Sequence, residues 1–184
     1  MTLLTTTDRS AVISECGLYR YRLERQTGAS SGTIAWLMLN PSTADATADD
    51  PTIRKVLGFS EQAHYRWVIV VNLFAWRATD PRDCRANLAQ AEGAQNRDYI
   101  LQAADDAQQL VCAWGAQPWA TAQACRVLRW FGGYRKQSLL RIGGELPKNG
   151  APRHPLMAPY ASGLVPFEAD AFCARHARAL GWSR

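Results

Sequence analysis

The chain has 184 residues, of which 47% are apolar and 20% charged, values that fit one globular domain and exclude a disordered chain. Its formal net charge is +5, and arginine supplies nearly all of the positive charge. Because guanidinium groups make bidentate contacts with phosphate, this excess indicates either a polyanionic partner or an ordinary arginine-rich soluble protein.

The chain begins with a polar, threonine-rich segment, residues 1–10, which lacks the charged start and apolar core of a signal peptide. No apolar run approaches the roughly 18 residues that span a bilayer. The cysteines are scattered singly, without metal-site spacing: Cys16, Cys84, Cys112, Cys125 and Cys173. We expect reduced thiols in a cytoplasmic protein, and a monomer without metal, cofactor or membrane attachment.

The first part of the chain contains two predicted strands and the start of a helix. Mainly charged residues alternate with tyrosine and leucine in residues 17–25, which predicts an edge strand or the first arm of a hairpin. Residues 33–40 are a nearly continuous apolar run, typical of a strand buried on both faces of a parallel sheet. Asp50 and Pro51 mark a helix start, because Asp accepts hydrogen bonds from free amides and Pro suits the first helical position.

Strands and helices then alternate to the end of the chain. In order we predict a strand at 67–74, a loop at 75–87, a helix at 92–107, a strand at 109–114, a helix at 119–131, a short strand at 138–142 and a helix at 168–180. This alternation predicts one three-layer α/β/α domain, residues 1–184. Its sheet should be four-stranded and mainly parallel, with an N-terminal edge strand or hairpin.

Four polar or permissive positions follow the predicted strands. They are Asn40, Asn72, Gly115 and the loop that contains His154, and in such sheets ligands bind beyond the carboxyl ends of the strands. Asn72 interrupts an apolar run, where an unpaired amide is costly to bury. Facing a cleft, it can offer both acceptor and donors to one edge of a planar base. The alternative is a core asparagine that holds a neighbouring loop.

His154 lies in a proline-rich loop, whose restricted backbone would hold the imidazole in place. An imidazole there can donate to an oxyanion as a leaving group departs. The alternative is a solvated loop histidine, so the argument depends on its neighbours in the fold.

Two groups in residues 42–50 are further candidates. Ser42 and Thr43 can offer hydroxyls and backbone amides to a phosphate, although Asn-Pro and Ser/Thr sequences also favour simple turns. Asp45, Asp49 and Asp50 resemble a hard-cation cluster. Solvated carboxylates and helix capping are the favoured interpretation, because no His or Glu completes the set.

Several segments resemble motifs of the uracil-DNA glycosylase superfamily. LNPS, residues 39–42, is similar to the first motif of the mismatch-specific and thymine-DNA glycosylases, in which Asn-Pro follows a short apolar strand. VVNLFAWRATDP at 70–81 and LVCAWGAQPWA at 110–120 resemble the second- and third-strand segments. HPL at 154–156 falls where the superfamily has His-Pro-Ser. MLNPSTAD, residues 38–45, looks closer still to a segment of an uncharacterised bacterial and phage family.

The resemblance implies a role for each matched residue. Asn40 would position the attacking water, and His154 would stabilise negative charge on the departing base. Asn72 would read the base edge, and Phe74 in the same segment is a further candidate for base contact.

The same interpretation assigns residues to nucleic-acid binding. Ser42 and Thr43, already named for phosphate, are joined by three arginines in loops near the strand ends: Arg77, Arg82 and Arg153. Leu156 and Met157 would form an apolar wedge that fills the space vacated by the base.

Three departures from the superfamily pattern stand out. Asn40 occupies the position of the Asp of the fastest uracil glycosylases, so no strong general base is present there. No Phe or Tyr lies between Pro41 and Arg54 to stack on a base. Leu156 replaces the Ser that follows His-Pro.

Residues and resemblance together predict a DNA glycosylase-like hydrolase that cleaves the N-glycosidic bond of a damaged or modified base. The partner would be single- or double-stranded DNA, or a modified nucleotide, and a target base in duplex DNA must leave the stack. One alternative is a catalytically inactive nucleic-acid-binding or nucleotide-sensing domain, favoured by the missing base and stacking aromatic. Another is a hydrolase of free modified nucleotides, which needs less basic surface.

Overall fold

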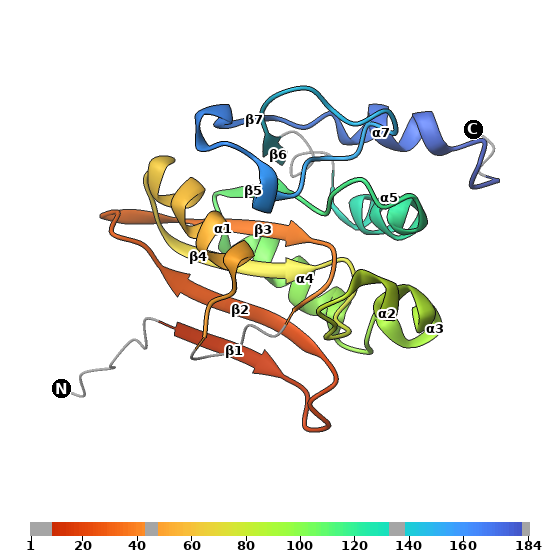
Figure 1. Cartoon of the computed structure of the whole chain (residues 1–184), viewed down its shortest axis with the longest axis horizontal. Coiled ribbons are helices and arrows are strands. Elements are labelled where there is room, and N and C mark those ends of the chain that lie inside the picture. The colour runs from red at the N-terminus through yellow and green to blue at the C-terminus, as the bar shows by residue number, and fades with distance from the viewer. Residues whose placement is uncertain (1–8, 43–47, 133–138, 182–184) are drawn as a thin grey trace.

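A mixed sheet of seven strands runs through the centre of the fold (Figure 1). The computed structural model of the chain describes residues 9–42, 48–132 and 139–181. Within these residues the strand order is β1-β2-β4-β3-β5-β6-β7. In chain order the strands are β1 (Arg9–Ile13), β2 (Arg20–Gln26), β3 (Ser31–Met38), β4 (Tyr65–Asn72), β5 (Gln109–Cys112), β6 (Leu139–Ile142) and β7 (Leu164–Pro166).

The four strands expected from the apolar runs are parallel neighbours. β3 pairs in parallel with β4 on one side and with β5 on the other, and β6 pairs in parallel with β5. The prediction of a four-stranded, mainly parallel sheet is nevertheless wrong, because antiparallel strands extend it at both sides. β2 pairs with β4, and β7 pairs with β6. β7 has only three residues, too few for a periodic pattern to be recognised.

The first two strands form a hairpin, as the alternating pattern suggested. β2 is its second arm rather than its first, and it lies inside the sheet between β1 and β4. The predicted edge position is therefore wrong. The edge strand is β1, whose five residues, RSAVI, alternate too little to be recognised from sequence.

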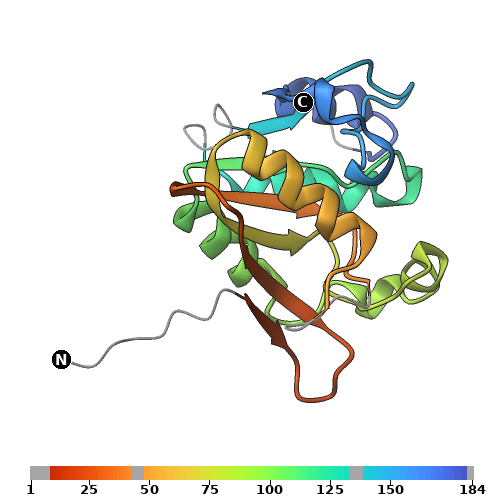
Figure 2. The same cartoon turned by 60° about the vertical axis from the view of Figure 1, so that its left-hand side comes forward.

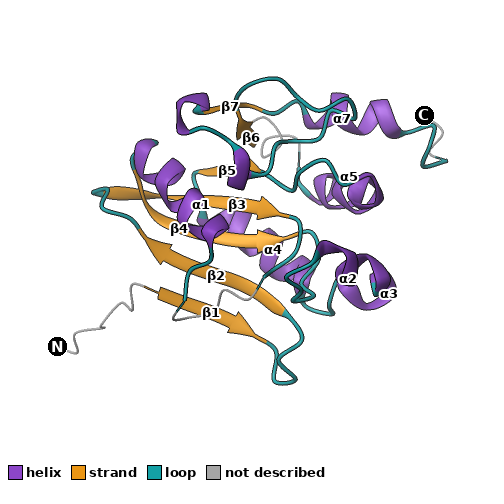
Figure 3. Ribbon diagram, in the orientation of Figure 1, coloured by secondary structure: helices purple, strands orange, loops and turns teal. Residues whose placement is uncertain are grey.

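Helices cover both faces of the sheet (Figures 2 and 3). Ile34 and Trp36 of β3 pack against the first helix on one face, whereas Ala35 and Leu37 pack in a second core with the later helices on the other. Among the described residues the helices are α1 (Pro51–Gln62), α2 (Pro81–Ala86), α3 (Leu88–Ala91), α4 (Asn96–Asp106), α5 (Thr121–Trp130) and α7 (Ala169–His176). None of the described helices combines the length and apolar composition that crossing a bilayer requires.

An aspartate followed by proline starts two of these helices. Asp50 caps α1, accepting a hydrogen bond from the Ile53 amide at 2.8 Å, which confirms the predicted start. Asp80 and Pro81 start α2 in the same way, inside the segment predicted to be a loop. That prediction is wrong because α2 is short and polar and buries only Cys84, so it has no apolar stripe to recognise.

A buried hydrogen bond between α1 and β3 gives a test of this packing. The indole nitrogen of Trp36 donates to Ser60 Oγ at 2.9 Å, and both residues are fully buried. Ser60→Ala leaves that donor unpaired and should lower the free energy of unfolding by about 1–3 kcal/mol, measured by urea denaturation. The same substitution in a Trp36→Phe background should cost clearly less, and an equal cost in both backgrounds would contradict this assignment.

Candidate functional site

One cavity of about 380 Å³ opens at the carboxyl ends of β3, β4 and β5. We call it the edge cavity. Asn40, Asn72, Gly115 and His154, the four positions singled out beyond the strand ends, all line it. The structure therefore brings together residues that lie far apart in the sequence, as predicted from the alternation of strands and helices.

Asn40 is fixed by the segment that follows β4. Its side-chain Nδ2 donates to the carbonyls of Ala78 at 2.8 Å and Pro41 at 3.1 Å. Two carbonyl acceptors settle the orientation of the amide, since its oxygen cannot donate to either. Asn40 Oδ1 has no donor among the described residues, so it can accept a hydrogen bond from a water in the edge cavity.

Asn72 ends β4 with only 2% of its surface exposed. Its Oδ1 accepts a long hydrogen bond, 3.5 Å, from Arg20, while its Nδ2 has no acceptor in the described part of the chain. Asn96 of α4 donates to the Asn72 carbonyl at 3.0 Å, and Gln123 of α5 donates to the Leu73 carbonyl at 3.0 Å. Two buried side-chain amides thus hold the backbone at this strand end, which makes Asn72 a rigid element of the cavity wall.

Arg20 is a cavity residue that the sequence analysis did not identify. It lines the edge cavity, is 2% exposed and donates to Asn72. A buried guanidinium presents hydrogen-bond donors only, so it favours ligand atoms that accept. Because Asn72 Oδ1 already accepts from Arg20, the pair offers donors, rather than the mixed donor and acceptor edge expected of Asn72 alone.

A β-bulge explains why Arg20 was missed. Simple alternation places Arg20 on the same face as Arg22, which forms an ion pair with Asp106 of α4 at 2.8 Å. The β1–β2 ladder shifts register next to Arg20. Tyr21 also faces α4, where it stacks on Tyr99 with ring centroids 5.3 Å apart. Two successive side chains on one face turn Arg20 to the opposite face, toward the edge cavity.

His154 enters the cavity as a neutral donor. Its Nδ1 accepts a hydrogen bond from the Leu156 amide at 3.3 Å, so the neutral ring carries its proton on Nε2. Burial lowers the pKa of His154, and the nearby Asp50 carboxylate opposes that shift. Gly115 packs on the same loop: it has φ +79°, and a Cβ there would lie 3.3 Å from His154 Cβ. Only glycine fits both the backbone and the contact easily.

Asp50 faces the cavity from the start of α1. Besides capping the helix through Oδ1, it accepts a hydrogen bond on Oδ2 from the Ser42 hydroxyl. Ser42 lines the cavity too, but its hydroxyl is directed to this carboxylate. From the sequence, Asp50 was interpreted only as a helix cap, so its place in the cavity wall was not predicted.

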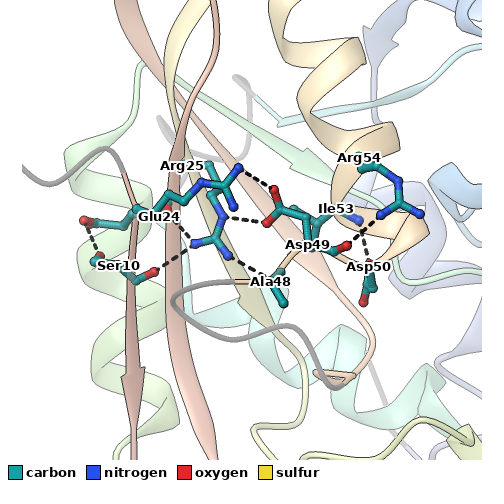
Figure 4. Close-up of polar contacts among 9 residues, drawn as sticks. Ser10, Glu24, Arg25, Ala48, Asp49, Asp50, Ile53 and Arg54 are labelled. Carbon is teal, nitrogen blue, oxygen red and sulfur yellow. Dashed lines mark hydrogen bonds and ion pairs between the residues drawn. The ribbon is translucent and has the colours of Figure 1, made fainter.

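A buried ion pair holds the segment before Asp50 in place (Figure 4). Arg25 of β2 is 1% exposed, and its Nε lies 2.7 Å from Asp49 Oδ1. The same guanidinium donates to the carbonyls of Ser10 in β1 at 3.3 Å and Ala48 at 3.5 Å. Arg9 adds a second ion pair to Asp49 at 3.2 Å. This network joins the N-terminal hairpin to the entrance of α1.

The aspartates expected to be solvated or to bind a cation have different environments. Asp45 lies outside the described residues, Asp49 is paired with arginine, and Asp50 is the helix cap. Among the described residues no group of three His, Cys, Asp or Glu side chains is placed to hold a metal ion.

The arginines expected to contact phosphate do not line the edge cavity. Arg77 donates to the Gly17 carbonyl at 3.0 Å, and Arg153 donates to the Gly143 carbonyl at 3.3 Å. Arg82 is exposed and pairs with Asp80, its Nε 2.8 Å from the carboxylate. Of these three arginines, Arg82 is the one with a mostly exposed side chain, at 89%.

Three further candidates fall in different places. Phe74 is buried against Trp119, with ring centroids 5.5 Å apart, and does not belong to the described cavity wall. Thr43 lies outside the described residues. Leu156 lines the cavity and is 41% exposed, and its neighbour Met157 is 84% exposed, so an apolar rim borders the opening.

Comparison with known proteins gives one match. A family model described as "Protein of unknown function (DUF1643)" matches residues 20–156, which include all the cavity residues described above. No curated protein and no solved structure matches the chain.

The buried ion pair gives a stability prediction with a matched control. Asp49→Ala leaves Arg25 buried beside an empty position and should lower the free energy of unfolding by about 3–5 kcal/mol, measured by urea denaturation. Asp106→Ala removes the 44% exposed partner of Arg22 and should cost less than about 1 kcal/mol. Equal losses in the two variants would contradict the role given to the buried pair.

The His154 environment predicts a pH dependence. Because the pKa of His154 is lowered by folding, the unfolded chain binds more protons below about pH 6.5. Stability should therefore fall as the pH drops below that value, and the loss should end below the folded-state pKa. His154→Gln should remove this part of the dependence. An NMR titration in which the His154 ring shows an ordinary or raised pKa would refute it.

Proposed function

The chain belongs to DUF1643, a family of proteins of unknown function, and we propose that it is a glycosylase-like hydrolase that cleaves the N-glycosidic bond of a damaged or modified base in DNA. The observation that carries this proposal is the arrangement of Asn40, Asn72 and His154 around one edge cavity. At about 380 Å³ the cavity is in the range of ligand pockets and is large enough for a single nucleobase.

Each of the three residues has a chemical task in this reaction. Asn40 Oδ1 accepts a hydrogen bond from the attacking water. The two hydrogen bonds donated by Nδ2 hold the Asn40 amide in this orientation. His154 donates a hydrogen bond from Nε2–H to the base as negative charge develops on the leaving group. A neutral imidazole suits this task because its lowered pKa keeps it uncharged near neutral pH.

Asn72 and Arg20 would recognise the base. Both side chains are part of the cavity wall and offer hydrogen-bond donors to a ligand. The proposal therefore requires a base with carbonyl acceptors on the edge that faces them. The apolar rim at Leu156 and Met157 is placed to occupy the gap left by an extruded base.

A second candidate function is hydrolysis of a free modified nucleotide. It is favoured by the positions of Arg77 and Arg153, which bind backbone carbonyls instead of facing the cavity mouth. With Arg82 as the remaining exposed arginine of the three, the described surface beside the cavity offers fewer phosphate contacts than a DNA enzyme was expected to have.

One panel of substrates distinguishes the two candidate functions from each other and from a catalytically inactive binding domain. Single- and double-stranded oligonucleotides, each with one modified base, are scored for abasic sites, and the matching free nucleotides are scored for released base. Cleavage of oligonucleotides supports the proposal, and release from free nucleotides alone supports the second candidate. A folded protein inactive on every member would overturn both and leave a binding domain.

On a substrate from this panel, we expect Asn40→Ala and His154→Ala to lower kcat by about a hundredfold or more with KM nearly unchanged. Both side chains act mainly in the transition state, so substrate affinity should not depend on them. Asn72→Asp should instead change which base is accepted, because a carboxylate replaces the amide donors. His64→Asn, in the turn that follows α1 and outside the lining of the edge cavity, is the control and should keep full activity. Cleavage that survives all three cavity substitutions would place the chemistry elsewhere.

A further inference from the structure

We propose that Asp50 is the general base of this reaction, which removes a proton from the water that Asn40 orients; the inference rests on the function proposed above. Asn40 can orient a water through its Oδ1, but an amide does not take up a proton near neutral pH. A carboxylate therefore has to come from another element if the reaction uses one.

The edge cavity contains few groups that can accept a proton. Among its described lining residues the titratable side chains are Arg20, Asp50 and His154. The guanidinium of Arg20 stays protonated, and Nδ1 of His154 already accepts from the Leu156 amide. Asp49, the neighbouring carboxylate, is paired with Arg25 and does not line the cavity. Asp50 is the one group left with the required chemistry in this wall.

The hydrogen bonds that Asp50 accepts orient its carboxylate and leave acceptor capacity for a further donor. Oδ1 accepts from the Ile53 amide at 2.8 Å, and Oδ2 accepts from the Ser42 hydroxyl. A carboxylate has about four lone-pair sites, and the described residues occupy two of them, which leaves room for a water molecule. The residue is only partly buried, which gives water access to it.

Capping alone does not explain this arrangement. A helix start is capped by one side-chain oxygen, and Asn or Ser serves nearly as well as Asp. Here the second oxygen has its own hydroxyl partner, and the carboxylate lies close enough to the imidazole of His154 for its charge to act on it. Among the described residues, Arg20 from β2 and His154 from the loop before β7 line the cavity with Asp50. Next to it in the chain are Asp49, which is paired with Arg25, and Arg54, which donates to the Asp49 carbonyl.

The step conserves atoms and charge. The water oxygen forms a bond to the anomeric carbon of the sugar while the bond from that carbon to the base nitrogen breaks. One water proton passes to an Asp50 oxygen, and the other remains on the new sugar hydroxyl. The electron pair of the broken bond leaves with the base, whose negative charge is offset by Nε2–H of His154. The base finally takes the proton from Asp50, which regenerates the carboxylate.

The test is Asp50→Asn, which keeps a capping side chain of nearly the same shape and removes the base. On a cleaved substrate we expect kcat to fall by about a hundredfold or more with KM within twofold of wild type. Urea denaturation should show that the variant unfolds at nearly the wild-type midpoint.

Asp80→Asn is the matched control, because Asp80 also caps a helix ahead of proline but does not line the cavity. It should leave kcat and KM unchanged. If wild type cleaves the substrate and Asp50→Asn retains its kcat, the general-base assignment is wrong while the proposed function stands. If wild type cleaves nothing on the panel, the proposed function fails, and the assignment falls with it.

Discussion

The parallel pairing of β3 with β4 is the constraint on which the site depends. Its register sets Met38 opposite Asn72, and the pairing continues after both strands have ended. The Leu73 amide donates to the Met38 carbonyl, and the Ala78 amide donates to the Pro41 carbonyl. The segments that follow β3 and β4 therefore leave the sheet side by side. A one-residue slip would turn Asn72 into the opposite core. The polar residues of the cavity therefore lie together because the backbones beneath them cannot slide.

Rigid and charged elements of the cavity come from different parts of the fold. The wall at Asn72 is held by amides from α4 and α5, which pack on one face of the sheet. The charged groups come from the opposite face, where Asp50 begins α1 and Arg20 leaves the N-terminal hairpin. The backbone at Asn72 is thus fixed by helices on one face, while the charged groups of the cavity are positioned by the hairpin and by the start of α1 on the other. Preorganised dipoles of this kind need little rearrangement when charge develops.

Sequence reasoning found the cavity residues that follow buried strands and missed those positioned by irregular features. Asn40 and Asn72 were predictable because long apolar runs fix where a strand ends and which edge it reaches. Arg20 was not, because a bulge reverses the face that alternation assigns. Arg77 and Arg153 were predicted to contact phosphate; the folded chain shows that each donates to a backbone carbonyl, which the sequence does not reveal. Asp50 was predictable as a helix cap, and because that role accounted for the residue, its place in the cavity wall was not predicted.

The Arg25 network bears on where the folding unit ends. The family match begins at residue 20, yet Arg25 takes one of its acceptors, the Ser10 carbonyl, from β1, which lies before that boundary. Arg9 of the same strand shares Asp49 with Arg25. A chain trimmed to the matched segment would expose the edge of β2 and remove partners from a buried cation. The segment matched by the family model is therefore shorter than the set of strands that surrounds Arg25, and a chain without β1 would need another acceptor in its place.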